Sequence, residues 1–186
     1  MFRLPHGFVK SLKNPGTAAV IPAALMLLFA LLLNVCAYAQ TSIGDEQDSD
    51  SGIRPNGIVE FLRPDGSLIT SVAVEIAESH EAHLRGLQGR PRVAQGFGML
   101  FLYETPRTLG FWMRNTPFSL DIIYVGADMR VLNVGQRVPP MSDMRHWSSG
   151  AASFVIEVPA GFAESTGIGT SSIMRWQRFT GLAGEK

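Results

Sequence analysis

An arginine, an asparagine and an aspartate stand among large apolar residues in one short stretch of this 186-residue chain. The run 111–116 contains Trp112, Arg114 and Asn115, and Asp121 follows a few residues later. Burial of such polar groups is costly unless each one finds a partner. Their placement therefore indicates either a binding site or a buried structural pair.

A hairpin would bring these side chains together. If 109–114 and 120–125 pair around the turn at 115–118, Trp112 lies opposite Asp121, and Arg114 lies diagonal to Asp121 on the same face. The other face would then be an apolar core face, made of Phe111, Met113, Leu120, Ile122 and Tyr124. The expected result is a polar and aromatic cluster on one side of a sheet.

Two interpretations of this cluster stay open. In the first, Trp112 stacks on a ligand ring or sugar while Arg114 and Asp121 orient the ligand by hydrogen bonds. In the second, the arginine and aspartate form a buried pair under the indole and only set the strand register. Arg85 is a further possible partner for Asp121. Asn115 suits the turn, where its side chain can bond to nearby backbone.

The sequence patterns that would indicate metal binding or hydrolysis are weaker. His80 and His83 would share a helix face, but a third ligand such as His146 or Asp143 would have to come from afar, so we expect no metal and no cofactor.

A glycosidase-like pair of carboxylates would combine Asp121 with Glu104 or Glu157, although Glu157 is expected on a solvent-facing strand position. The chain contains no Gly-x-Ser-x-Gly elbow. No catalytic residue is therefore assigned.

The loop 139–150 carries Trp147 and two methionines, which is unusually apolar for an exposed segment. Loops often carry function, so this loop could cover the hairpin cluster as a lid. It could equally place Trp147 against one end of the domain as a plug.

Alternation of apolar residues and turn signals predict mostly strands. The predicted strands span 58–63, 67–77, 99–103, 109–114, 120–125, 130–138, 153–158 and 173–179. Helices are expected at 79–87, capped by Ser79, and at 159–166. About seven or eight short strands with one or two short helices predict an all-β, compact, sandwich- or barrel-like domain rather than a βαβ sheet.

Residues 1–39 are typical of a secretory signal that is cleaved after Ala39. Two alternatives are lipidation at Cys36 and an uncleaved membrane anchor. An acidic, disordered leader over 40–57 and a single domain over 58–186 are expected to follow. Since Cys36 is the only cysteine, the mature protein could form no disulfide.

The charge of the chain argues against nucleic acid as a partner. Removal of three basic residues with the signal leaves 13 basic against 16 acidic residues, a net charge of −3, and no basic cluster stands out. We expect a periplasmic or extracellular protein with no membrane span after cleavage.

Five short motifs resemble those of the bacterial and archaeal family known as domain of unknown function 192. In order, they are Arg85-Gly86-Leu87, Gly98-Met99-Leu100-Phe101, Phe111-Trp112-Met113-Arg114-Asn115-Thr116, Leu120-Asp121-Ile122-Ile123 and Glu157-Val158-Pro159-Ala160-Gly161. The resemblance implies an all-β sandwich or barrel, often behind a secretion signal, and no established reaction. The chain departs from the family pattern at Gln88, where methionine is common, and at 169–171, where Gly-Asp is usual.

The leading hypothesis is a non-catalytic binding module for a small ligand, sugar, peptide or envelope protein. Its site would contain Trp112, Arg114 and Asp121, with the 139–150 loop at the rim. One alternative is a hydrolase with Asp121 as general base, aided by another carboxylate or by His146. Another is a structural accessory domain of the cell envelope.

Overall fold

The computed structural model describes residues 52–180, which all belong to one compact unit. The expected signal and most of the expected leader lie outside the described residues. Residues 52–56, at the end of that leader, are held in place. Arg54 donates its backbone N–H to the Glu75 carboxylate at 2.9 Å, and Arg90 donates to the Gly52 carbonyl at 2.6 Å.

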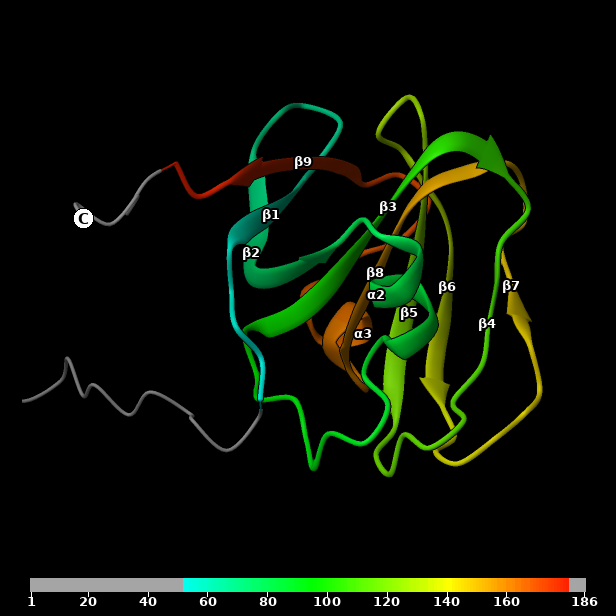
Figure 1. Cartoon of the computed structure of the whole chain (residues 1–186). Helices are drawn as coiled ribbons and strands as arrows, with labels where there is room; N and C mark the ends of the chain where they lie inside the picture. The colour runs from blue at the N-terminus through cyan, green and yellow to red at the C-terminus, as the bar shows by residue number, and fades with distance from the viewer. Residues whose placement is uncertain (1–51, 181–186) are drawn as a thin grey trace, which may run out of the picture. The chain divides into compact units, whose positions relative to one another are not determined.

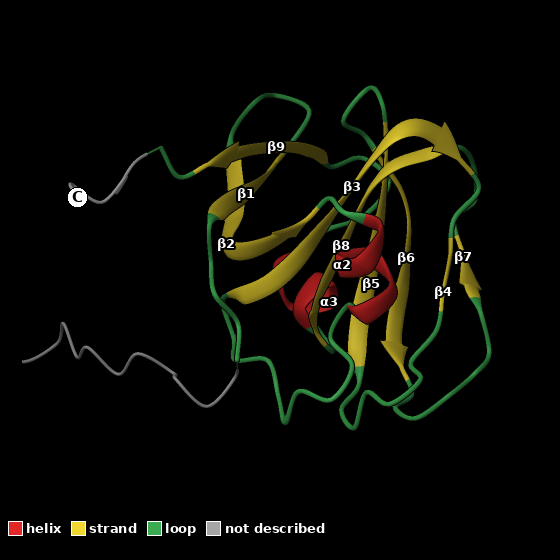
Figure 2. Ribbon diagram, viewed as in Figure 1, coloured by secondary structure: helices red, strands yellow, loops and turns green. Residues whose placement is uncertain are grey.

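Nine strands and two short helices lie within the described residues, as Figure 2 shows in yellow and red. The strands are β1 (Gly57–Leu62), β2 (Leu68–Ala77), β3 (Phe97–Arg107), β4 (Gly110–Phe111), β5 (Leu120–Gly126), β6 (Val131–Val138), β7 (His146–Trp147), β8 (Ala152–Pro159) and β9 (Ile173–Arg178). The helices are α2 (His80–Arg85) and α3 (Phe162–Thr166). The all-β prediction is thus confirmed, and neither of these helices is long and apolar enough to cross a membrane.

Seven of the strands form one mixed sheet in the order β6-β5-β8-β3-β2-β1-β9, and β4 and β7 form a separate two-stranded ribbon. Every neighbouring pair in the large sheet is antiparallel except β2 and β3. Parallel neighbours need a crossover connection, and α2 lies within it. The prediction that a βαβ arrangement would not dominate holds, but one such unit is present.

The large sheet is strongly curved (Figure 1), and its two edges meet at one end. Arg130, just before β6, forms an isolated bridge with Ile173 at the start of β9. The Met174 amide donates to the Met129 carbonyl at 2.7 Å, and the Val131 amide donates to the Ser172 carbonyl at 3.1 Å. The edges are joined at one end only, so the sheet is a partly open barrel.

Each face of this curled sheet carries its own apolar core. The interior core receives side chains from all seven strands and from Phe162 and Ala163 of α3. The second core lies on the outer face of β3, β8 and β5, under α2 and the β4–β7 ribbon. The strands β5 and β8 are therefore buried on both faces, as their nearly uninterrupted burial shows.

The hairpin predicted between 109–114 and 120–125 is wrong. Only Gly110–Phe111 of the first segment is a strand, and it pairs with His146–Trp147 of the 139–150 loop. Met113 donates to the Ser142 carbonyl at 2.9 Å, which ties the segment further to this loop. The strand β5 instead pairs with β6 and β8. The expected core face is nevertheless confirmed, since Phe111, Met113, Leu120, Ile122 and Tyr124 all belong to the second core.

Gly98 marks a close approach between β3 and β8. A Cβ at this position would lie 2.5 Å from the Glu157 carbonyl oxygen, which is backbone and cannot move aside cheaply. Glycine therefore allows the β3 backbone to pass next to Glu157.

Candidate functional site

A pocket of about 250 Å³ opens on the outer face of the sheet, between α2 and the β4–β7 ribbon. Its walls are apolar and aromatic, with Leu84, Leu87, Phe101, Tyr103, Phe111 and Trp112. Its polar lining includes His80, His83, Arg85, Arg107, Arg145 and Glu157. We call this the α2 pocket. The α2 pocket thus combines aromatic walls with several convergent polar groups, and a concave surface with convergent polar groups is a common form of small-molecule site.

Glu157 lies at the floor of the α2 pocket, on the central strand β8. It is 5% exposed and is flanked across the sheet by Met99 and Ile122. Its Oε2 atom is buried and has no hydrogen-bond partner among the described residues. The expectation that Glu157 faces solvent is wrong, because β8 is covered on both faces rather than on one.

Burial raises the pKa of Glu157 to about 8, against a smaller opposing effect of the Arg90 charge. Arg90 itself is engaged elsewhere, with two hydrogen bonds to the Glu75 carboxylate at 3.0 and 2.8 Å. Burial would raise the pKa of Glu75 too, but hydrogen bonds from Arg90 and from the Arg54 amide lower it overall. Two glutamates on one face of the sheet thus have opposite pKa shifts, because only Glu75 has partners.

The helix α2 forms one wall of the pocket and is fixed at its start by Ser79, whose side chain accepts from the Ala82 amide at 3.1 Å. This is the predicted cap. His83 donates from Nε2 to the Ala77 carbonyl at 3.0 Å, and its ring packs against Tyr103 with centroids 4.4 Å apart. Burial also raises the pKa of Tyr103 to about 12. His83 therefore joins α2 to the sheet.

Three exposed arginines line the pocket above Glu157. Arg107 lies over the Tyr103 ring, 5.0 Å from its centroid, and Arg145 donates to the Gly110 carbonyl at 3.2 Å. Neither has a carboxylate within ion-pair distance among residues 52–180. Arg85 forms a long surface ion pair with Glu81, at 4.0 Å. The mouth of the pocket is therefore positively charged and available to an anion.

Trp112 holds two guanidinium groups over its ring, that of Arg114 at 4.2 Å and that of Arg145 at 4.4 Å from the centroid. The predicted contact between Trp112 and Arg114 is thus present. Arg114 also pairs with Asp143 at 2.7 Å. Both cations lie over the indole, which therefore helps to position Arg145 at the pocket.

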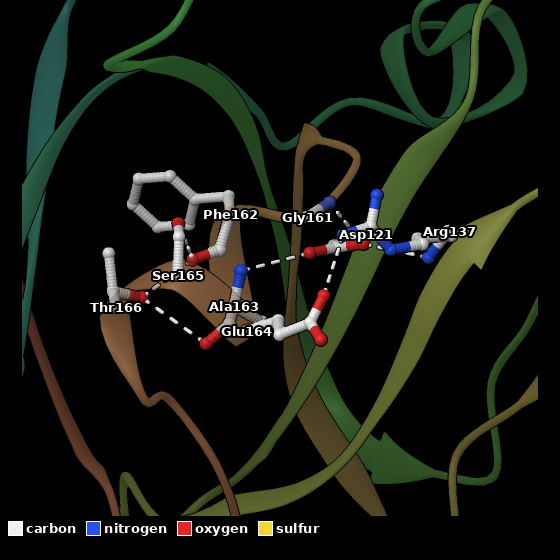
Figure 3. A network of polar contacts seen from close by, with 8 residues as sticks. All are labelled: Asp121, Arg137, Gly161, Phe162, Ala163, Glu164, Ser165 and Thr166. Carbon is white, nitrogen blue, oxygen red and sulfur yellow. Dashed lines mark hydrogen bonds and ion pairs between the residues drawn. The ribbon is translucent and has the colours of Figure 1, made fainter.

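Asp121 lies on the opposite face of the sheet, in the interior, and is 0% exposed. Its Oδ1 accepts from the amides of Arg137 at 2.8 Å and Gly161 at 3.1 Å, and its Oδ2 accepts from the amide of Ala163 at 2.9 Å. Figure 3 shows the carboxylate between β6 and the start of α3. These hydrogen bonds connect the start of α3 to the sheet.

The structure therefore does not bring Asp121 together with Trp112, Arg114 or Arg85. Asp121 faces Val158 in the sheet, whereas Glu157 faces Ile122, and neighbouring residues of a strand point to opposite faces. The suggested carboxylate pair of Asp121 and Glu157 across one cleft is wrong for the same reason. The interpretation of Asp121 as half of a buried arginine pair is also wrong, since its partners are backbone amides.

The remaining candidates have distinct places. Asn115 adopts a φ of +50° in a tight turn, where its carbonyl accepts from the Gly89 amide at 2.8 Å. Trp147 is 54% exposed, and a Cβ on Gly110 would lie 2.7 Å from its ring. The 139–150 loop thus contains β7, one strand of the ribbon, and places Arg145 at the pocket. Within residues 52–180, no three His, Cys, Asp or Glu side chains form a group that could hold a metal ion.

The sequence interpretation missed Glu157, Arg107 and Arg145 as parts of one site. One signal could have found Glu157: strand 152–159 is apolar at nearly every position, which is typical of a strand buried on both faces. A glutamate within such a strand must be buried. The two arginines carried no comparable signal, because the ribbon that positions Arg145 depends on pairing distant in sequence.

The fold and site together define a small, partly open β-barrel domain with a pocket on its outer face. A family model, DUF192, described as "Uncharacterized ACR", matches residues 61–176. The chain belongs to this family, as its motifs indicated.

Two solved structures are similar to this chain. One is a protein of unknown function from Novosphingobium aromaticivorans DSM 12444, 31% identical, covering 64% of this chain and 84% of that chain with a TM-score of 0.60. The other is described provisionally as a transcription regulator of Sinorhizobium meliloti 1021; it is 24% identical and covers 65% and 93% with a TM-score of 0.62, a likeness of fold alone. A comparison with curated proteins found no match.

Substitution of Asp121 by asparagine should lower the free energy of unfolding by about 2–3 kcal/mol, because one amide oxygen cannot replace a carboxylate that accepts three backbone hydrogen bonds. Urea denaturation measures this change. The matched control is Glu164→Gln in the same network, which removes an exposed pair with Arg137 and should cost less than about 1 kcal/mol. An unchanged midpoint for Asp121→Asn would contradict the structural role.

Stability should fall with rising pH because of Glu157. Burial raises the pKa of Glu157 from its ordinary value of 4.5 to about 8 in the folded protein. The folded protein therefore holds the proton more tightly than the unfolded chain does. This contribution to stability is complete below pH 4.5 and is lost as pH rises through about 8. The fall in unfolding free energy is on the order of a few kcal/mol. Urea denaturation at about pH 5, 7 and 9 measures it, and Glu157→Gln should flatten the profile. An equally steep profile in that variant would show that another group is responsible.

Proposed function

We propose that this chain is an exported, non-catalytic domain that binds a small organic anion in the α2 pocket. The observation that carries this proposal is the unpartnered, buried carboxyl group of Glu157 at the floor of a pocket with arginines at its mouth. A buried polar group without a partner destabilises the fold by about 1–3 kcal/mol. Such a group is understandable where a ligand supplies the missing hydrogen bond.

A comparison of two carboxyl groups in one sheet supports this interpretation. Asp121 is buried for structural reasons, and both of its oxygens accept backbone hydrogen bonds. Glu157 has no such bond at Oε2, although it is one strand away. A structural role alone would account for Asp121 but not for Glu157, which argues against a purely structural envelope domain.

The charge at the mouth supports an anion as the ligand. Arg107 and Arg145 have no acidic partner among the described residues, and Arg145 is held in position by the Trp112 ring. Guanidinium groups bind carboxylates and phosphates through paired hydrogen bonds. The apolar walls between the mouth and Glu157 would hold the ring or chain of the ligand.

The hydrolase alternative, with Asp121 as general base, has less support. A general base must reach the proton that it removes, and Asp121 is fully buried on the face opposite the pocket. If the pocket did carry out acid–base chemistry, Glu157 would be the candidate for the group that transfers the proton. The described lining of the pocket contains no serine or cysteine that could act as a nucleophile, and binding is therefore the function we propose.

Benzoate should bind in the α2 pocket, and benzamidine, which has the same ring with a cationic group, should not. Amide chemical-shift changes in a titration locate and quantify binding. Arg107→Gln and Arg145→Gln should each weaken benzoate about three- to tenfold, since each removes a charged hydrogen-bond donor. Arg175→Gln, which alters an exposed arginine paired with Glu60, is the control and should have no effect. Equal binding of the cation, or unchanged affinity in both pocket variants, would contradict the proposal.

Export rests on residues 1–39, and it predicts that the mature protein begins at Gln40. Intact-mass measurement of the protein from fractionated bacterial cells that express the full chain tests this directly. Ala39→Arg should block processing, because the cleavage site requires a small residue. A diacylglycerol-sized increment on Cys36 would support the lipoprotein alternative instead, and an uncleaved chain in the cytoplasm would contradict export.

A further inference from the structure

We infer that the α2 pocket takes a hydroxylated aromatic acid, with its acidic group at the arginines and its hydroxyl at Glu157. This inference rests on the proposed function and adds the arrangement of polar groups along the ligand. It follows from the separation of the exposed arginines from the buried Glu157 carboxyl group, and from the aromatic residues that line the same pocket.

The polar groups of the pocket are separated by depth. Arg85, Arg107 and Arg145 are exposed, whereas Glu157 is 5% exposed. The lining also includes the buried Phe101 and the half-buried Phe111, whose rings meet edge to face with centroids 4.9 Å apart. A complementary ligand is therefore charged at one end, flat and apolar in the middle, and polar at the other end.

Glu157 favours a hydroxyl over a cationic group at the inner end. Burial raises its pKa to about 8, so the carboxyl is mostly protonated at neutral pH and can both donate and accept a hydrogen bond. A hydroxyl has the same two capacities. An ammonium group would have to lose its hydration and pass three arginines, and it would pair only with an ionised carboxylate. The attraction within a buried ion pair often fails to offset the desolvation of the two charges.

The size of the pocket favours a small ligand. Its volume of about 250 Å³ is below the range of about 300–1,000 Å³ that is usual for drug-sized molecules. A benzene ring with one acidic substituent and one hydroxyl fits this limit.

The test compares four para-substituted benzoates that share one acidic group: benzoate, 4-hydroxybenzoate, 4-methoxybenzoate and 4-(aminomethyl)benzoate. Dissociation constants come from titrations of the wild-type protein followed by amide shifts. We expect 4-hydroxybenzoate to bind about tenfold more tightly than benzoate, because its hydroxyl completes a buried hydrogen bond. The methoxy compound keeps an acceptor but loses the donor and gains bulk, so it should bind no better than benzoate.

Two variants connect the preference to the floor of the pocket. Glu157→Gln keeps a donor and an acceptor, and should keep the preference for the hydroxyl. Glu157→Leu removes both, and should bind benzoate and 4-hydroxybenzoate equally. If the leucine variant does not fold, the wild-type series and the glutamine variant still decide the matter.

The outcomes separate this inference from the proposed function. If benzoate binds and the hydroxyl adds nothing, the inference fails while the proposed function stands. If 4-(aminomethyl)benzoate binds most tightly, the inner group is an amine and the inference also fails. If none of the four shifts the pocket amides, both fail.

Discussion

The antiparallel register between β5 and β8 is the constraint on which the other features depend. In this register Asp121 faces Val158, and Ile122 faces Glu157. Because successive side chains of a strand point to opposite faces, the register sends one carboxyl group into the interior and the other to the outer face. A shift of β5 by one residue would move Asp121 to the outer face beside Glu157 and would exchange the two apolar faces of β5. The two cores therefore fix the positions of both acids.

The two acids have different energetic consequences. Asp121 accepts three backbone hydrogen bonds and connects β5 to β6 and α3, so its burial stabilises the interior. Glu157 has an unpartnered oxygen, which costs about 1–3 kcal/mol unless a ligand is bound. Apolar packing on both faces of β5 and β8 can offset that cost. Functional sites are commonly the places where a fold retains such locally unfavourable groups.

The sequence predicts the elements of this fold far better than their partners. Alternating residues in 67–77 and the Ser79 cap are local signals, and the corresponding β2 and α2 are present. The pairing of 109–114 was mispredicted because a short connection favours a hairpin, whereas the segment actually pairs with a loop more than 30 residues away. Glu157 was misplaced because alternation was applied to a strand that is buried on both faces. The first error concerns a tertiary contact that no local pattern contains, whereas the second overlooked the nearly continuous apolar run of 152–159.

The β4–β7 ribbon shows how long-range contacts build the mouth of the pocket. Tyr124, buried in the second core, donates its hydroxyl to the His146 carbonyl at 2.5 Å. Asn133 of β6 donates to the Trp147 carbonyl at 3.0 Å, and Leu109 donates its amide to the Ser148 hydroxyl at 2.9 Å. These bonds fix the backbone on both sides of the ribbon. Arg145 immediately precedes β7, so the same core that buries Glu157 also determines where the cation above it lies.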